Sequence, residues 1–424
     1  MPDAGRASAS GGEPDVGDVG VASVATAGTV AVEAAAVEVS VADVLAAQAR
    51  LRRYLPVTPM HHAERFGVML KLENLQRTGS YKVRGALNAL LAARERGDRR
   101  PVICASAGNH AQGLAWAAHR LGMQAITVMP HGAPETKIAG VAHWGATVRQ
   151  HGDSYDEAYA FARELAEQNG YRFLSAFDDP DVIAGQGTIG IEIAPHAPDV
   201  VIVPIGGGGL ASGVALALKT LSGSRGFRGQ SVRVVGAQVE GVDAMARAIK
   251  GDVRPIDPAR SLADGVRVKV PGFLTRRLCA RLLDDVVIVR EAELRETVVR
   301  LALEENVIAE GAGALALAAG RRVAGKRKCA VVSGGNIDAA TLATLLSEVR
   351  PRPPRRPRRR RGELEPATPP GRTAPEPATG DAATRKTAPV AKRRPTANLS
   401  PSPTISAPPA PSAPQPVSEE EFTW

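Results

Sequence analysis

The strongest constraint on the fold is a regular alternation of short apolar runs with longer segments from residue 102 onward. Each run suits a buried strand, and each longer segment has the apolar spacing of a helix. The pairs of run and segment are 102–106 with 113–121, 125–129 with 135–144, 146–148 with 155–168, 200–205 with 210–221, 232–239 with 243–250, 286–289 with 291–306, and 329–332 with 339–346. This order predicts an α/β fold, in which mostly parallel sheets are covered by helices.

A run of glycines follows the apolar segment 200–205, where a strand would end and a helix begin. The residues are Gly206, Gly207, Gly208 and Gly209, and Leu210 comes next. Ligands of parallel sheets bind at the carboxyl ends of the strands. Uncovered backbone amides together with a helix N-terminus favour a phosphate group. The run matches neither the Walker nor the dinucleotide motif, and a structural tight turn is the alternative explanation.

Short polar residues follow the run 102–105 in the same way. Ser106, Asn109 and His110 lie at the expected start of a helix. Helix capping would account for Ser106 and Asn109. The functional interpretation is that a hydroxyl, a carboxamide and helix amides together bind a carboxylate.

Lys82 lies where a strand-like run over 68–75 and a Thr78-Gly79-Ser80 break give way to a helical segment. The positive field of helix amides disfavours a charged lysine and lowers its pKa, which favours the neutral amine that can attack an aldehyde. Taken alone, Lys82 could equally be an ordinary solvated lysine.

A hydroxyl follows the last apolar run, in the stretch Ser333-Gly334-Gly335-Asn336. Ser333 at a strand end could reach the nitrogen of a bound ring, although a simple turn would also explain the stretch. A phosphate cradle, a carboxylate site, a lysine and a hydroxyl on separate loops of one sheet suggest pyridoxal phosphate as the cofactor.

Seven collinear stretches of the chain resemble the motifs of the fold type II pyridoxal-phosphate enzymes, and most of all those of threonine dehydratase (threonine ammonia-lyase). The resemblance covers about 39–349 and implies a two-domain, tryptophan synthase β-like fold with a smaller subdomain at about 102–178. The stretches are Ser80-Tyr-Lys-Val-Arg-Gly-Ala86, Ser106-Ala-Gly-Asn-His-Ala-Gln-Gly113, Ile183-Ala-Gly-Gln-Gly-Thr188, the four glycines, Ala263-Asp-Gly-Val266, Glu310-Gly-Ala-Gly-Ala314 and Ser333-Gly-Gly-Asn336.

The resemblance implies roles for the residues around the cofactor. Lys82 would bind pyridoxal phosphate covalently and then move the Cα proton of the substrate. The glycines 206–209 and Leu210 would bind the phosphate through backbone amides. Tyr81 and Gly265 would lie against the two faces of the ring.

The same resemblance implies further polar contacts. Asn109 would hydrogen-bond the phenolic oxygen of the cofactor and contribute to substrate binding. Ser106 and His110 would help to hold the substrate carboxylate. Ser333 would hydrogen-bond the pyridine nitrogen. No metal ligand is expected.

The implied reaction is β-elimination of L-threonine to 2-oxobutanoate and ammonia, with L-serine giving pyruvate, in amino-acid metabolism such as isoleucine biosynthesis. A serine beside the ring nitrogen does not keep that nitrogen protonated, which favours rapid loss of the β-hydroxyl. L-serine dehydratase and serine racemase are the alternatives within the family. Racemases need a second hydroxyl where this chain has Ala107, and their acidic metal position is Gln238 here.

Both ends of the chain differ in composition from its centre. Residues 1–38 and 350–424 lack the apolar content of a core, so we expect both to be disordered. The formal charge of the chain is +9, yet residues 350–424 carry 14 Lys and Arg against 7 Asp and Glu, which leaves 39 against 37 elsewhere. Because the tail is Pro/Arg-rich where biosynthetic relatives continue into a regulatory domain, we expect no such domain and no inhibition by isoleucine.

A function of another class would be a scaffold or nucleic-acid-binding protein acting through this basic tail. Arginine runs attract phosphates, but no aromatic residue is interleaved with these arginines, so stacking on bases is disfavoured and we expect no nucleic-acid ligand.

The chain has three unclustered cysteines, Cys104, Cys279 and Cys329. They argue for a reducing compartment and against a disulfide framework or a zinc site. Neither a secretory signal nor an apolar run long enough to span a bilayer is present, so we expect a cytoplasmic protein without membrane partners. By analogy with the family, we expect a homo-oligomer.

Overall fold

The structure, a computed structural model, describes residues 38–222 and 231–348, which belong to one compact unit of the chain. The disorder expected for residues 1–37 and for the tail from residue 350 therefore concerns parts of the chain outside the described residues.

The larger sheet has the strand order β1-β2-β10-β7-β8-β9. Strand β1 pairs antiparallel with β2, and every other pair in this sheet is parallel. The strands are β1 (Met60–Ala63), β2 (Val68–Leu72), β7 (Val200–Pro204), β8 (Arg233–Val239), β9 (Asp285–Val289) and β10 (Lys328–Val332).

The smaller sheet is parallel throughout and has the order β5-β4-β3-β6. Its strands are β3 (Val102–Ala105), β4 (Ala125–Met129), β5 (Thr147–Gln150) and β6 (Arg172–Phe173). They lie within the range 102–178 that we expected for the smaller subdomain. The domain boundaries themselves stay a prediction.

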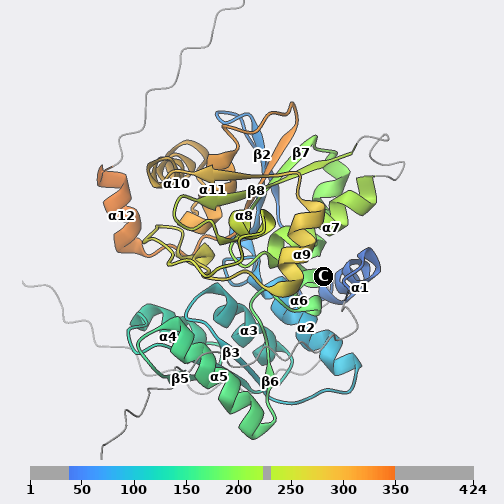
Figure 1. Cartoon of the computed structure of the whole chain (residues 1–424), viewed down its shortest axis with the longest axis vertical. Helices are drawn as coiled ribbons and strands as arrows, with labels where there is room; N and C mark the ends of the chain where they lie inside the picture. The colour runs from blue at the N-terminus through green and yellow to red at the C-terminus, as the bar shows by residue number, and fades with distance from the viewer. Residues whose placement is uncertain (1–37, 223–230, 349–424) are drawn as a thin grey trace, which may run out of the picture. The chain divides into compact units, whose positions relative to one another are not determined.

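Helices lie on both faces of each sheet and between the sheets. Figure 1 shows the two sheets at opposite ends of the described unit, with α2 and α6 between them. The helices are α1 (Val41–Leu51), α2 (Lys82–Glu95), α3 (Asn109–Arg120), α4 (Glu135–Ala142), α5 (Tyr155–Asn169), α6 (Pro180–Ile193), α7 (Gly209–Ser222), α8 (Ala244–Ile249), α9 (Phe273–Leu282), α10 (Glu291–Glu305), α11 (Gly311–Ala319) and α12 (Ala339–Glu348), with short 3₁₀ turns η1 (Glu73–Leu75), η2 (Ala194–His196) and η4 (Asp264–Val266).

The pleat of the larger sheet explains why its strands are apolar on both faces. In β7, Val200 and Ile202 pack into the core that includes α10 and α11, whereas Val201 and Val203 pack into the core on the opposite face that includes α7. Successive side chains of a strand point to opposite faces, so a sheet covered on both sides needs a continuous apolar run. The predicted α/β class is therefore confirmed, with its cause visible in the core.

A buried group of charges joins the larger sheet to α2 and α6. Arg84 Nε lies 2.7 Å from Glu73 Oε2, Arg84 Nη1 lies 2.7 Å from Glu192 Oε1, and Lys71 Nζ lies 2.6 Å from Glu192 Oε2. Lys71, Glu73 and Arg84 are at most 2% exposed. We call these four residues the buried charge network. Through Arg84, which lies two residues after Lys82, the network attaches the first turn of α2 to η1 and α6.

Candidate active site

Lys82 is the first residue of α2, and the residues just before it are fastened to the end of β10. Ser80 forms an isolated bridge with Gly334, and the Tyr81 backbone N–H donates to the Ser333 carbonyl oxygen at 3.1 Å. The break predicted at residues 78–80 is thus where the chain crosses from one loop of the sheet to the start of a helix. Lys82 is held at that crossing.

The side chain of Lys82 lies in surroundings that favour its neutral form. Its Nζ donates to the Ala176 carbonyl oxygen at 2.8 Å and lies 5.3 Å from the centre of the Tyr81 ring. Burial lowers the pKa of Lys82 from 10.5 to about 8, against the opposing effect of the negative charge of Glu310. The sequence predicted a lowered pKa from the helix amides, whereas burial is the larger cause in the structure.

The glycine loop lies between the end of β7 at Pro204 and the start of α7 at Gly209. A side chain on Gly207 would place its Cβ 2.2 Å from Phe177 Cγ, and Gly208 has a φ of +98°. Only glycine satisfies both demands, because it has no Cβ and tolerates positive φ. The Thr275 hydroxyl donates to the Gly207 carbonyl oxygen at 2.7 Å and so fixes this peptide of the loop.

Gly206 and Leu210, which flank the glycines 207–209, differ in what they could offer a ligand. A Cβ on Gly206 would lie 3.0 Å from Val266 Cα and 3.5 Å from the Gly265 carbonyl oxygen, so the glycine loop contacts the 3₁₀ turn η4. Leu210 is 3% exposed and its side chain packs in the core of the larger sheet. Only its backbone amide could take part in the phosphate contact that we predicted for it.

The Asn109 carboxamide is held at both ends. Its Nδ2 donates to Glu310 Oε1 at 2.7 Å, and its Oδ1 accepts from Asn336 Nδ2 at 2.8 Å. Asn336 Nδ2 also donates to the Thr78 carbonyl oxygen at 2.8 Å. An amide nitrogen carries two hydrogens, so one N–H of Asn109 is left for a further acceptor. This carboxamide is therefore oriented before any ligand binds.

Ser333 lies at the end of β10, as predicted, and is 3% exposed. Its hydroxyl donates to the Ala312 carbonyl oxygen at 3.2 Å. Donation to a ring nitrogen would require this hydrogen to turn away from Ala312.

Ser106 and His110 already have partners within the chain. The Gly108 backbone N–H donates to Ser106 Oγ at 3.2 Å, and His110 Nε2 lies 3.2 Å from the Leu174 carbonyl oxygen. Burial, helped by the charge of Lys82, lowers the pKa of His110 to about 3, so its ring is neutral at neutral pH. A contact of Ser106 and His110 with a substrate carboxylate stays a prediction. Because His110 is neutral, it could make this contact only through a hydrogen bond and not through a positive charge.

The loops predicted from the sequence are joined through contacts between neighbours. Gly207 packs on Phe177, and the neighbouring Ala176 accepts a hydrogen bond from Lys82. Tyr81, which precedes Lys82, binds Ser333. Gly334, which follows Ser333, lies close to Glu310, and Glu310 binds Asn109. A Cβ on Gly265 would lie 4.0 Å from Glu310 Oε1, which brings η4 to the same place. Residues from four strand-end loops thus surround the start of α2.

Glu310 and the segment with Ala176 and Phe177 are the parts of this arrangement that sequence reasoning missed. Glu310 belongs to a quoted motif, and its position as a lone acid before the apolar helix α11 was a usable signal. Ala176 and Phe177 follow β6, which has only two residues and gives no apolar run. Burial, with the negative charge of Asp264, raises the pKa of Glu310 from 4.5 to about 7.

The residues around Lys82 suit a group that carries an aldehyde and a phosphate. A lysine amine with a lowered pKa, a loop of four glycines before a helix, and the free N–H of Asn109 are the complementary functions. The Ser80 hydroxyl is buried and has no hydrogen-bond partner within the described structure, so it too could serve a bound molecule.

Two exposed ion pairs connect the loop that carries Gly265 with helices beside the smaller sheet. Lys137 Nζ lies 2.9 Å from Asp264 Oδ2, and Lys269 Nζ lies 2.5 Å from Asp156 Oδ2. Lys137 belongs to α4 and Asp156 to α5.

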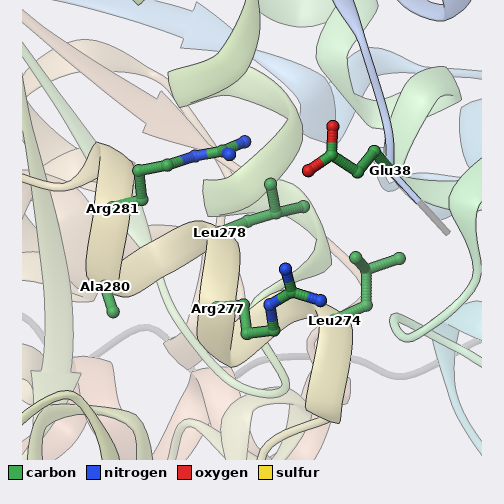
Figure 2. A pocket seen from close by; sticks show the side chains of 6 residues that line it. All are labelled: Glu38, Leu274, Arg277, Leu278, Ala280 and Arg281. Atoms are coloured by element: carbon green, nitrogen blue, oxygen red, sulfur yellow. The ribbon is translucent and has the colours of Figure 1, made fainter. Parts of the chain in front are cut away.

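A separate surface hollow contains none of the predicted site residues. It is lined along α9 by Leu274, Arg277, Leu278, Ala280 and Arg281, with Glu38 facing them (Figure 2). Within residues 38–222 and 231–348, no group of three His, Cys, Asp or Glu side chains is arranged to hold a metal ion. No helix in those two ranges is both long and apolar enough to cross a membrane.

Sequence comparison places the chain beside pyridoxal-phosphate dependent enzymes. A family model with that description matches residues 51–334. The chain is similar to an L-threonine ammonia-lyase of Thermotoga maritima, with 43% identity over 66% of this chain and 70% of the relative. It is also similar to the L-threonine dehydratase catabolic TdcB of Escherichia coli, with 39% identity over 73% of this chain and 97% of the relative.

Solved structures give the same fold. The processed form of threonine deaminase isoform 2 from Solanum lycopersicum is 34% identical, with a TM-score of 0.66 over 72% of this chain and 86% of that structure. Maize serine racemase is 29% identical, with a TM-score of 0.66 over 73% of this chain and 97% of that structure.

Proposed function

This chain belongs to the pyridoxal-phosphate dependent enzyme family, and we propose that it is a threonine ammonia-lyase, which converts L-threonine to 2-oxobutanoate and ammonia and also acts on L-serine. The observation that carries the proposal is the meeting of Lys82, the glycine loop and Asn109 at one point of the fold, in a chain 39–43% identical to threonine-deaminating enzymes.

The cofactor, when bound, supplies an aldehyde and a ring that accepts electrons from the substrate Cα. The chain's own residues would hold the cofactor and move the Cα proton of the substrate. Backbone amides of the glycine loop would bind the phosphate, and the free N–H of Asn109 would bind the ring oxygen. Lys82 Nζ, whose pKa is lowered to about 8, accepts the Cα proton in its neutral form. The Ser333 hydroxyl would bind the ring nitrogen after turning away from the Ala312 carbonyl oxygen, and Tyr81 and Gly265 would lie against the two faces of the ring.

Elimination is favoured over racemisation by the groups near the ring. A racemase needs a second acid on the far face, and the alanine Ala107 offers no proton. Gln238 stands at the acidic metal position of the racemases. Its Nε2 donates to the Ile205 carbonyl oxygen at 3.3 Å and its Oε1 accepts from the Ala246 N–H at 2.8 Å, so both ends of its amide are used by the backbone. Serine racemase activity and L-serine dehydratase activity are the second candidates, since maize serine racemase shares the fold.

The decisive experiment combines a spectrum with product detection. Purified protein should absorb in the visible range with pyridoxal phosphate, and should release 2-oxobutanoate from L-threonine. Lys82→Ala should lose both properties, whereas Lys250→Ala, a change of an exposed lysine at the end of α8, should keep them. A wild-type protein that takes up no pyridoxal phosphate would refute the proposal. One that binds it and yields D-serine but no oxo acid would favour the racemase.

We further propose a cytoplasmic homo-oligomer that works in amino-acid metabolism. Light scattering of the purified chain tests the oligomer. Growth of an isoleucine-requiring bacterial strain that expresses the chain tests a part in isoleucine biosynthesis. We expect an unchanged rate under saturating isoleucine, and inhibition would contradict this expectation.

A further inference from the structure

Glu310 is a buried acid for which the proposed reaction has no task. It stands at the N-cap position of α11, where a carboxylate would normally cap the helix. Its side chain makes no capping hydrogen bond. Instead, its Oε1 accepts a hydrogen bond from Asn109 Nδ2 at 2.7 Å. Glu310 as a whole residue is 7% exposed. The acid is therefore directed at the site and not at its own helix.

The charged groups that face Glu310 come from three elements. Lys82 and Tyr81 at the start of α2 both feel its charge. Asp264 of η4 raises the pKa of Glu310, and Lys137 of α4 lowers it, together with Lys82. Burial and Asp264 outweigh the favourable contacts, so the carboxyl titrates near pH 7. The carboxyl can therefore change charge near neutral pH, and its charge influences Lys82, which must change charge in the proposed reaction.

The contact with Asn109 has a consequence for the cofactor-facing amide. Asn336 and Glu310 bind opposite ends of the Asn109 carboxamide, so neither a flip nor a rotation of this group is possible without losing both hydrogen bonds. An ionised acceptor makes the stronger bond. The charge of Glu310 hence controls how firmly Asn109 is held.

We propose that Glu310 is a positioning residue of the lyase site: its carboxylate holds the Asn109 carboxamide in place and favours the protonated form of Lys82. This role rests on the proposed function. When Lys82 Nζ accepts the substrate Cα proton, it becomes an ammonium group, and the nearby negative charge of Glu310 stabilises it. Glu310 itself forms and breaks no covalent bond, and the proton stays on Lys82 until the leaving hydroxyl or solvent takes it.

The first test uses the cofactor-free protein and Glu310→Gln, which keeps an oxygen acceptor for Asn109 but removes the charge. Loss of a nearby opposite charge lowers a lysine pKa by about one unit or more. For Lys82, whose pKa is about 8, the midpoint of the pH dependence of labelling should fall by about one unit in Glu310→Gln, because Glu310 is mostly ionised at that pH in the wild type. The labelling rate of Lys82 with an amine reagent is followed by peptide mass spectrometry across this pH range. An unchanged midpoint would overturn the charge effect.

A second test uses a pair of variants that break one ion pair in two ways. Asp264→Asn and Lys137→Gln both remove the same Lys137–Asp264 contact, so a purely structural effect would be shared. Their effects on Glu310 have opposite sign: Asp264→Asn lowers its pKa and Lys137→Gln raises it. The acid limb of kcat/KM for threonine should accordingly move to lower pH in the first and to higher pH in the second. Shifts in the same direction, or none, would refute the proposal.

The two tests separate failure of this inference from failure of the proposed function. Labelling of Lys82 needs no substrate and no turnover, so it reports on Glu310 even if threonine proves not to be the substrate. If Glu310→Gln does not fold, the ion-pair variants decide, because Asp264 and Lys137 have side chains 57% and 37% exposed. Glu310→Asp, which keeps the charge, should return the Lys82 labelling rate towards the wild-type value. A labelling rate in Glu310→Asp equal to that in Glu310→Gln would overturn the charge effect as well.

Discussion

Replacing Arg84 by methionine should strongly destabilise the fold, because the buried charge network would lose its central cation. Arg84 makes four hydrogen bonds to carboxylates, with Nε and Nη2 donating to Glu73 and Nη1 and Nη2 donating to Glu192. Burial alone would lower the pKa of Arg84, yet the two carboxylates raise it above its ordinary value. Glu73 is 0% exposed and cannot regain water when its partner is removed.

The expected loss follows from the burial of the charges that remain. Removing one partner of a buried ion pair costs about 3–5 kcal/mol, since an uncompensated charge stays in the interior. Glu192 keeps Lys71, whereas Glu73 keeps only the Thr58 hydroxyl among the residues that the structure describes, so the figure should lie within this range. A typical domain has a net stability of about 5–15 kcal/mol. Arg84→Met should therefore remove a large part of the stability of the chain.

Urea unfolding followed by circular dichroism measures this change through the midpoint and slope. Arg96→Met is the matched control, because the Arg96–Asp181 pair has its arginine 56% exposed. Exposed pairs contribute about 0–1 kcal/mol. Adding Glu73→Gln to Arg84→Met should recover part of the loss, since the stranded charge disappears. If Arg84→Met costs no more than Arg96→Met, the attribution of stability to the buried network is wrong.

Three further predictions concern cofactor binding by the glycine loop, the pKa of Lys82, and the free energy of unfolding at acid pH. Gly207→Ala should weaken pyridoxal-phosphate binding, measured by fluorescence titration, because the new Cβ would lie 2.2 Å from Phe177 Cγ. Gly132→Ala is the control and should leave the affinity unchanged, because a Cβ at Gly132 has nothing within 4 Å. Equal affinities in the two variants would argue against phosphate binding by the glycine loop. In the cofactor-free protein, the pH dependence of Lys82 labelling should have its midpoint at about 8, and a midpoint near 10.5 would contradict burial of the amine. The pKa of Glu192 lies below its ordinary 4.5 despite burial, because Arg84 and Lys71 favour the carboxylate. Its contribution to stability is thus present above pH 4.5 and lost as the pH falls through the folded-state value, so the unfolding free energy should fall less steeply with acid in Glu192→Gln than in wild type.

The alternation of apolar runs predicted the fold class because the rule behind it is local. Strand β4 begins and ends at the expected residues, Ala125 and Met129, and α2 begins at Lys82 as expected. Helix α11 was missed, because every residue from Gly311 to Ala319 is buried and a helix buried all round has no apolar period. Helix α3 begins at Asn109, four residues before the expected 113, since Asn109 and His110, which we expected at the approach to the helix, belong to its first turn.

The residues of the site could be proposed from motifs, but their partners could not. Asn109 and Glu310 are 201 residues apart in the chain, and their hydrogen bond exists only because two sheets place their loops together. The Lys82–Ala176 contact likewise depends on a strand of two residues. The roles of the individual site residues toward cofactor and substrate stay predictions until the variants above are measured.

The two sides of the site differ in how easily they could yield. Beneath Lys82, the buried charge network resists displacement, because any movement would expose unpaired charges to an apolar interior. On the other side, the loop with Gly265 is joined to α4 and α5 by the Lys137–Asp264 and Lys269–Asp156 pairs, which water and salt can replace. Raising the ionic strength therefore loosens one wall of the site and leaves the lysine anchored. Thermal motion at the site should accordingly be larger in the loop with Gly265 than at the start of α2.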